Sequence, residues 1–117
     1  MKKYIWVATL CSPVNSLLKN KTLKDSFHWI QDDFCSHNID KVDIPCLCFE
    51  DWSKVLDYFN NYICQTNSLL SKSRTMKNEK AEILEDISFN EDGKCYSYSL
   101  KVAGIYFVSI KYQPYFF

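Results

Sequence analysis

The residue types best suited to chemistry in this chain lie in one short stretch, CSHNIDKVDIPCLC, which begins at Cys35 and ends at Cys48. Cys35, His37, Cys46 and Cys48 are ligands of the kinds that zinc prefers, and four is the coordination number of a structural zinc site. Their spacing is unfavourable, because zinc sites usually take ligand pairs from tight turns with two to four residues between them, whereas Cys46 and Cys48 are two positions apart in an apparent strand. Apolar neighbours favour burial of these cysteines in the core. We therefore expect no metal and no cofactor.

Thiol chemistry is the other use that this stretch suggests. The Cys-x-Cys pair differs from the Cys-x-x-Cys arrangement in which a helix N-terminus lowers a thiol pKa. No sequence feature brings His28 or His37 to a cysteine as a general base, and neighbouring acids such as Asp32 and Asp33 are typical of a solvated face. The sequence therefore predicts a protein that is not an enzyme. A small thiol- or zinc-dependent enzyme that uses the region from Cys35 to Cys48 is the alternative hypothesis.

Length, charge and composition narrow the class of protein. A chain of 117 residues is typical of one domain, spanning residues 1–117, and 47% hydrophobic residues supply a core for it. Lys plus Arg and Asp plus Glu number 14 each, so the net charge favours neither nucleic acid nor an anionic membrane. With two glycines in the chain, phosphate-binding loops of the dinucleotide or P-loop type are excluded. The apolar run at residues 4–10 is short and lacks a small-x-small cleavage site, so we expect a cytoplasmic protein.

Blocks of period two and period 3.6 alternate along the chain. Residues 4–10 form a β-rich run, a helical pattern extends from Thr22 to about Asn38, and a second strand pattern covers residues 41–49 around Pro45. A longer amphipathic helix is predicted from Asp51 to about Leu70, followed by a polar, basic loop. Three further β-rich runs cover residues 83–89, 94–102 and 105–112. The predicted fold is α+β, in the order β-α-β-α-β-β-β: a mixed, mainly antiparallel sheet with two helices packed on it and a C-terminal three-stranded meander.

Acidic side chains recur through the middle of the chain, where only Lys41 and Lys54 oppose them. The series consists of Asp32, Asp33, Asp40, Asp43, Glu50, Asp51 and Asp57. A shared negative surface of this kind would attract a basic protein partner and raise its association rate. An equally simple interpretation is a solvated face, with Glu50 and Asp51 complementing a helix dipole. The tail KYQPYFF adds Tyr115 and Phe116 as aromatic residues that either fold back on the core or meet a partner.

The overall profile resembles the immunity proteins of bacterial polymorphic and contact-dependent growth-inhibition toxins. The shared features are small size, few glycines, an acidic patch, no catalytic motif and a composition rich in Asn, Lys, Tyr and Phe. The resemblance implies a stoichiometric inhibitor that covers the active site or substrate surface of a cognate toxin, often a nuclease domain, without itself touching nucleic acid or membrane. A net charge of zero departs from the strongly acidic nuclease inhibitors and leaves a non-nuclease toxin open. A phage-encoded inhibitor of host defence is a further alternative, and it would bind its protein partner through the same kinds of contact.

Overall fold

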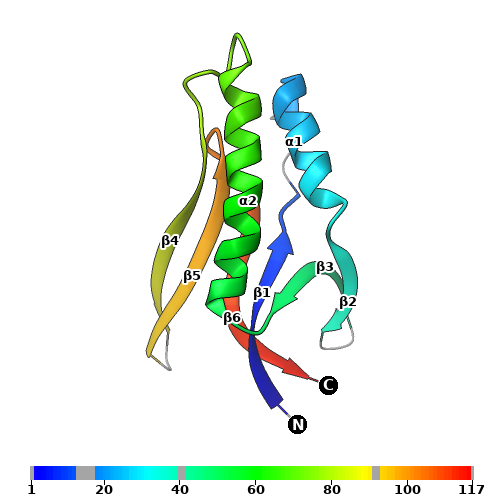
Figure 1. Cartoon of the computed structure of the whole chain (residues 1–117). Coiled ribbons are helices and arrows are strands. Elements are labelled where there is room, and N and C mark those ends of the chain that lie inside the picture. The colour runs from blue at the N-terminus through cyan, green and yellow to red at the C-terminus, as the bar shows by residue number, and fades with distance from the viewer. Residues whose placement is uncertain (1, 13–17, 40–41, 91–92, 117) are drawn as a thin grey trace.

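The computed structural model describes the backbone of residues 2–12, 18–39, 42–90 and 93–116, and the side chains of residues 4–12, 18–36, 43–85 and 97–113. The elements in chain order are β1 (Lys2–Leu10), α1 (Lys21–Gln31), β2 (Cys35–Ile39), β3 (Val42–Phe49), α2 (Trp52–Ser71), β4 (Ala81–Asn90), β5 (Gly93–Val102) and β6 (Ile105–Phe116). The described strands form one six-stranded sheet in the order β2-β3-β1-β6-β5-β4, and each neighbouring pair is antiparallel. Both helices lie on one face of it (Figure 1). The predicted α+β architecture is confirmed, including the C-terminal meander of β4, β5 and β6.

The first helix ends earlier than predicted, and an additional strand follows it. The apolar spacing predicts a helix to about Asn38, whereas α1 ends at Gln31 and the next residues form β2, which pairs with β3. The backbone N–H groups of Asp33 and Phe34 each donate to a carbonyl three positions earlier, which tightens the chain into a turn after α1. Phe34 still packs against the core from this turn, so its apolar spacing is satisfied without a helix.

The proline in β3 lies where the predicted edge requires it. The β1–β3 register runs from Trp6↔Phe49 to Thr9↔Cys46 and therefore ends one residue before Pro45. Pro45 is opposite Ser36 of β2. The first half of β3 thus has β2 as its neighbouring strand, and the missing N–H of the proline is tolerated because β1 does not pair there.

A β-bulge in the meander adds a large side chain to the core between the sheet and the helices. The β5–β6 register passes from Leu100↔Val108 to Lys101↔Tyr106, so Phe107 is the extra residue on β6. A regular strand would turn Phe107 and Val108 to opposite faces, yet both are fully buried. The Phe107 ring lies 5.1 Å from that of Phe27 on α1, in an edge-to-face arrangement. The bulge therefore helps to fix α1 on the sheet.

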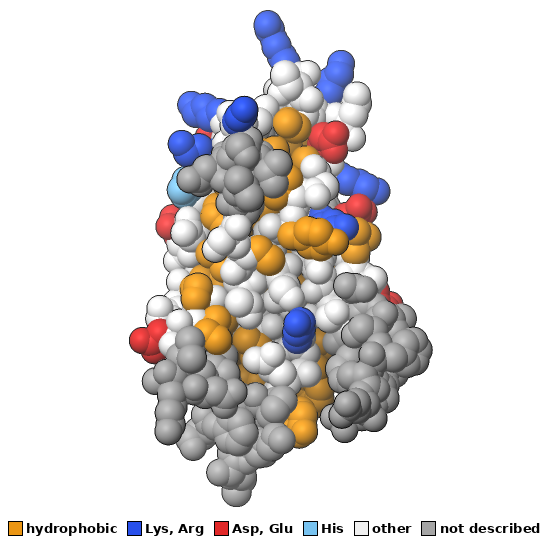
Figure 2. Space-filling model, turned by 180° about the vertical axis from the view of Figure 1, so that it is seen from behind, with side chains coloured by type: hydrophobic (Ala, Val, Ile, Leu, Met, Phe, Trp, Pro, Cys, Tyr) orange, Lys and Arg blue, Asp and Glu red, His pale blue; other side chains and the backbone are white. Residues whose placement is uncertain are grey.

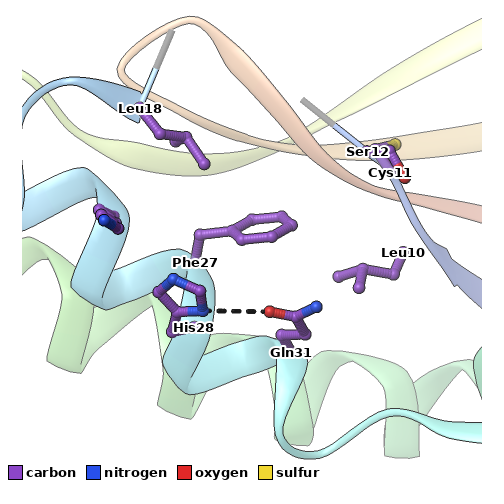
Figure 3. A pocket seen from close by; sticks show the side chains of 8 residues that line it. Leu10, Cys11, Ser12, Leu18, Phe27, His28 and Gln31 are labelled. Carbon is purple, nitrogen blue, oxygen red and sulfur yellow. Dashed lines mark hydrogen bonds between the residues drawn. The ribbon is translucent and has the colours of Figure 1, made fainter. Parts of the chain in front are cut away.

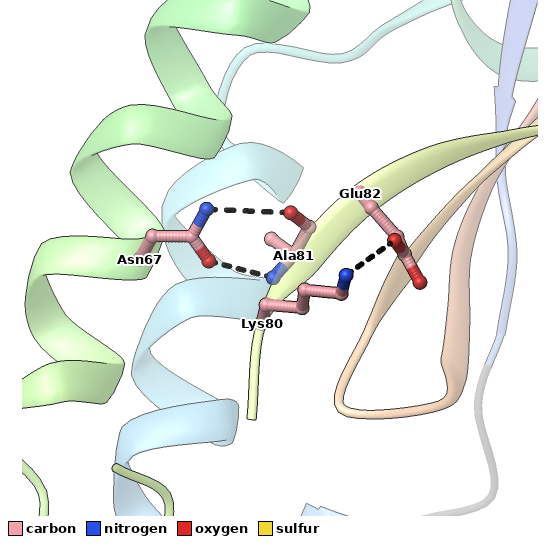
Figure 4. A network of polar contacts seen from close by, with 4 residues as sticks. All are labelled: Asn67, Lys80, Ala81 and Glu82. Carbon is pink, nitrogen blue, oxygen red and sulfur yellow. Dashed lines mark hydrogen bonds and ion pairs between the residues drawn. The ribbon is translucent and has the colours of Figure 1, made fainter. Parts of the chain in front are cut away.

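Two sets of side-chain hydrogen bonds hold α2 in place. The buried Ser26 hydroxyl on α1 lies 2.7 Å from the Tyr62 hydroxyl and 3.1 Å from Thr66 Oγ1. At the other side of α2, Asn67 brackets the start of β4: its Oδ1 accepts from the Ala81 N–H at 2.7 Å, and its Nδ2 donates to the Ala81 carbonyl at 3.3 Å (Figure 4). These hydrogen bonds therefore fix the position of α2 relative to α1 and to the start of β4, and with it the outer surface between the two helices.

Candidate functional site

The cysteines of the Cys35–Cys48 stretch lie close together on the β2–β3 pair. Cys35 is directly opposite Cys46, and the fully buried Cys46 packs in a small apolar cluster with Ile5, Val7 and Cys48. Burial, assisted by the neighbouring thiols of Cys48 and Cys35, raises the pKa of Cys46 to about 12. A thiol with so high a pKa is protonated at neutral pH, and the thiolate is the form that attacks electrophiles or binds metals.

Metal binding likewise finds little support in this stretch. In the part of the chain that the structure describes, no group of three or more His, Cys, Asp or Glu side chains is arranged to hold a metal ion. The side chain of His37 lies outside that part. Burial also raises the pKa of the Cys48 thiol. The burial expected of these cysteines is confirmed for Cys46 and in part for Cys48, whereas Cys35 is exposed.

A cavity with a volume of about 610 Å³ lies at the end of β1, beside α1. It brings Cys11 and His28 to the same space, but Figure 3 shows His28 turned toward Gln31 instead of toward the thiol. His28 Nδ1 lies 3.2 Å from Gln31 Oε1, and burial raises the pKa of Cys11. No hydrogen bond joins Cys11 to His28 among the described contacts, so the pair lacks the geometry of a nucleophile and its base. The cavity is lined by Leu10, Cys11, Ser12, Leu18, Lys24, Phe27, His28 and Gln31.

The predicted acidic surface is divided between separate places. Asp32 and Asp33 lie in the turn after α1 and Asp57 lies on α2, all three exposed. Exposed Asp43 and Glu50 lie toward opposite ends of β3, about 20 Å apart at the usual rise per residue of a strand. Asp40 lies outside the described residues. Asp43 and Glu50 are therefore well separated, whereas Asp32 and Asp33 are neighbours in one turn.

Glu50 and Asp51 come directly before α2, where their role in the helix can be checked. Asp51 is the N-cap residue, and its backbone carbonyl accepts from the N–H groups of Lys54 and Val55. Its carboxylate makes no capping hydrogen bond and is exposed. Helix capping thus leaves this charge available at the surface.

A groove between the two helices contains one of these acidic residues, Asp33. We call it the interhelical groove; it has a volume of about 310 Å³ and is lined by Trp29, Asp33, Tyr58, Asn61, Tyr62 and Gln65. The Tyr58 hydroxyl donates to Asp33 Oδ2 at 2.6 Å, and burial together with this carboxylate raises the pKa of Tyr58. The indole of Trp29 lies 5.4 Å from the ring of Tyr62 and is 39% exposed. The groove thus combines an open aromatic surface with a carboxylate.

An exposed aromatic surface lies beyond the start of α2. We call it the aromatic platform; its members are Tyr4, Trp6, Trp52, Tyr98 and Tyr112. Trp6 is its centre, with ring centroids 4.6 Å from Trp52 and 5.1 Å from Tyr112, and Tyr4 stacks on Tyr112 at 5.7 Å. Tyr98 lies 4.2 Å from Trp52. Tyr4 and Tyr112 are 50% and 52% exposed, and Figure 1 shows β1 and β6 extending past the start of α2, where these strands have no helix over them.

The sequence did not predict the aromatic platform, because the β-rich run at residues 4–10 does not show which of its side chains the helices leave uncovered. The predicted anchors Tyr115 and Phe116 belong to β6, where their backbones pair with Lys3 and Lys2 of β1. Their side chains lie outside the described ones. The signal that was available is the pair Tyr4 and Trp6, two positions apart and therefore on one face of a strand.

Basic side chains gather at the opposite end of the molecule. Asn20, the N-cap of α1, donates from Nδ2 to Thr75 Oγ1 at 2.8 Å, which joins the loop after α2 to the start of α1. Figure 2 shows Lys and Arg side chains clustered over this end. Lys80 pairs with Glu82 at 3.3 Å (Figure 4). The exposed cations at the two joined segments are Lys19, Lys21, Lys24, Lys72, Arg74, Lys77 and Lys80. Although the net charge of the sequence is zero, most of the Lys and Arg side chains that the structure describes lie in these two segments.

Comparisons of the chain with protein-family profiles, with curated proteins and with solved structures find no match. Neither of the helices in the described ranges is long and apolar enough to cross a membrane. The functional argument consequently rests on the surfaces described above.

Proposed function

We propose that this chain is a protein-binding module that acts as a stoichiometric inhibitor, with the aromatic platform as its main contact surface. The observation that carries the proposal is that Tyr4 and Tyr112 are about half exposed although both belong to a tightly stacked cluster. Stacked rings are rigid, so they bury a large apolar area with little loss of side-chain entropy when a partner covers them. Aromatic residues of this kind dominate the binding energy of protein interfaces.

The acidic residues next to the platform favour a partner with a basic rim. Asp51 is exposed directly before Trp52, which belongs to the platform, and its carboxylate makes no cap bond. Opposite charges at the edge of an interface raise the rate of association more than the affinity. The partner that fits the profile is a cognate bacterial toxin, whose active site or substrate surface this chain would cover in the cytoplasm as an immunity protein.

The test is co-expression with the toxic domain encoded by the neighbouring gene. A one-to-one complex in size-exclusion chromatography with light scattering is expected, together with protection of cells from the toxin. Tyr112→Ala should weaken the complex at least tenfold, since central aromatic anchors contribute about 2 kcal/mol or more. Tyr106→Ala is the matched control, because Tyr106 is on the same strand, is also 52% exposed and lies outside the platform. Failure to form any complex, or equal weakening by both variants, would contradict the proposal.

A further inference from the structure

We propose that the interhelical groove receives an arginine side chain of the protein partner, with Asp33 as its counter-ion and Trp29 as its stacking surface. This inference rests on the proposed function, because it assumes that the chain binds a protein. It goes further in naming a second contact site and the chemical group that enters it.

Asp33 provides the charge, and its geometry leaves room for a second partner. Its Oδ2 accepts the short hydrogen bond from Tyr58, which fixes the carboxylate at the groove instead of leaving it to rotate in solvent. Its Oδ1 has no hydrogen-bond donor among the described side chains and backbone groups. A guanidinium group presents N–H donors in a planar fork that matches the two oxygens of a carboxylate. The fixed carboxylate is therefore prepared for a group with this shape.

Trp29 provides the surface that distinguishes arginine from other cations. One side of the indole packs against Tyr62, and 39% of the residue remains exposed. The flat, weakly hydrated guanidinium stacks on aromatic faces, whereas the compact ammonium of lysine retains its water. Gln65 also lines the groove and donates through Nε2 to Asn61 Oδ1 at 3.2 Å, so its side-chain carbonyl remains an acceptor that the other donors of an arginine can use.

The charges around the groove favour a cation over a neutral ligand. Asp32 precedes Asp33 in the same turn, and Asp57 precedes Tyr58 on α2. Lys54, one turn before Tyr58, is the one basic residue of α2, and the basic end of the molecule lies at the other ends of both helices. Among the described residues, Asp33 is the one charged residue that lines the groove, and within four positions of its lining residues Asp33 and Tyr58 the chain carries two further carboxylates against the one ammonium group of Lys54. This imbalance also gives a local field that attracts the positive side chain during encounter.

The experiment is an NMR titration of the full chain with N-acetyl-arginine-methylamide, and with the citrulline and lysine analogues as probes. The indole N–H signal of Trp29, assigned by its loss in Trp29→Phe, should shift with a saturable dependence on the arginine probe and with at least fivefold weaker apparent affinity for both analogues. Asp33→Asn should weaken binding of the arginine probe at least fivefold. Asp25→Asn is the matched control, because Asp25 is an exposed acid on α1 that does not line the groove.

Equal responses to arginine and citrulline, or an unchanged affinity in Asp33→Asn, would overturn the assignment of the groove. Neither result would disturb a one-to-one complex with a toxin that depends on Tyr112, so the proposed function would stand. Conversely, binding of the arginine probe with no protein complex would support the groove's selectivity and refute the proposed function alone.

Discussion

Buried hydrogen bonds among Ser26, Tyr62 and Thr66 join the two helices beside the interhelical groove, and their contribution to the free energy of unfolding can be measured. Tyr62 lines this groove, and its hydroxyl donates to the Ser26 carbonyl at 2.8 Å. Because that proton is used, the Ser26 hydroxyl at 2.7 Å donates to the Tyr62 oxygen, and the Thr66 hydroxyl donates to Ser26 Oγ at 3.1 Å. Ser26 and Thr66 are fully buried, so water does not replace a bond that is lost. The variant of interest is Tyr62→Phe.

The expected cost follows from counting these bonds. Tyr62→Phe removes two of them at about 1 kcal/mol each, so the free energy of unfolding should fall by about 2 kcal/mol. Ser26→Ala also removes two, to Tyr62 and to Thr66, and should cost about the same. The bond between Ser26 and Tyr62 is counted in both variants, so the double variant should lose about 3 kcal/mol, and the coupling energy should be about 1 kcal/mol.

Urea unfolding followed by circular dichroism measures these differences, and the midpoint shift at constant slope gives each free-energy change. Tyr112→Phe is the control for a tyrosine hydroxyl at the surface, since Tyr112 is 52% exposed, and its effect should stay below about 0.5 kcal/mol. Additivity of Tyr62→Phe and Ser26→Ala within about 0.3 kcal/mol would refute the shared bond. A neutral Tyr62→Phe would refute the whole argument.

Four further predictions concern other parts of the fold. Asn67→Ala, which removes both bonds to Ala81, should lower the free energy of unfolding by about 2 kcal/mol in the same urea assay. Phe107→Ala should lower it by about 3–5 kcal/mol, because the bulge buries this ring completely. Ala103→Asn should raise it by about 1 kcal/mol, since Ala103 has a φ of 53°, a left-handed conformation that Asn tolerates better. The pKa of Cys46 is raised from 9.0 to about 12 in the folded state. The stabilising contribution of the protonated thiol is therefore complete below pH 9 and is lost as the pH rises toward 12. Cys46→Ala should consequently flatten the fall of the urea midpoint between about pH 9 and 11.

Each of these predictions has a control nearby in the chain. Ser68→Ala changes the exposed residue next to Asn67 and should be neutral. Tyr106→Ala, beside Phe107 but exposed, should cost less than about 1 kcal/mol, mostly from the contact of its ring with Lys101 Nζ at 4.2 Å. Gly104→Ala should destabilise, because Gly104 has a φ of 78°. Cys64→Ala, which removes an exposed cysteine instead of a buried one, should leave the urea midpoint at neutral pH unchanged. If a control variant had a larger effect than the variant with which it is compared, the physical reason given for that variant would be contradicted.

Local patterns were sufficient to predict most of the fold, because apolar residues recur with period two in half-buried strands and with period 3.6 in half-buried helices. In β5, for example, Leu100 and Val102 alternate with the polar residues Ser99 and Lys101, and both are fully buried. β2 was beyond such reasoning, since CSHNI has little intrinsic strand preference and owes its extended form to pairing with β3. Phe107 was equally hidden, because a bulge breaks the alternation on which the prediction depends.

The candidate surfaces depend on distances through space that sequence separation does not reveal. Asp33 meets Tyr58 although 25 positions separate them, while Asp43 and Glu50, much closer in sequence, lie toward opposite ends of one strand. Similarly, the exposure of Tyr4 and Tyr112 depends on where α2 begins relative to the sheet. Residue types and spacing indicated an acidic and aromatic binding surface, but the choice of residues within it required the three-dimensional arrangement.

The two proposed contact sites are close enough for one partner to cover both. Trp52 of the aromatic platform and Tyr58 of the interhelical groove lie on the same helix, and the six residue steps from position 52 to position 58 span about 9 Å of its axis. Phe49, whose ring lies 5.7 Å from that of Tyr58, fills the space toward the sheet. A standard interface, which buries about 800 Å² on each partner, extends over a greater distance than this separation. A partner that covers both proposed sites would present an apolar patch and, roughly two helical turns away, a protruding arginine.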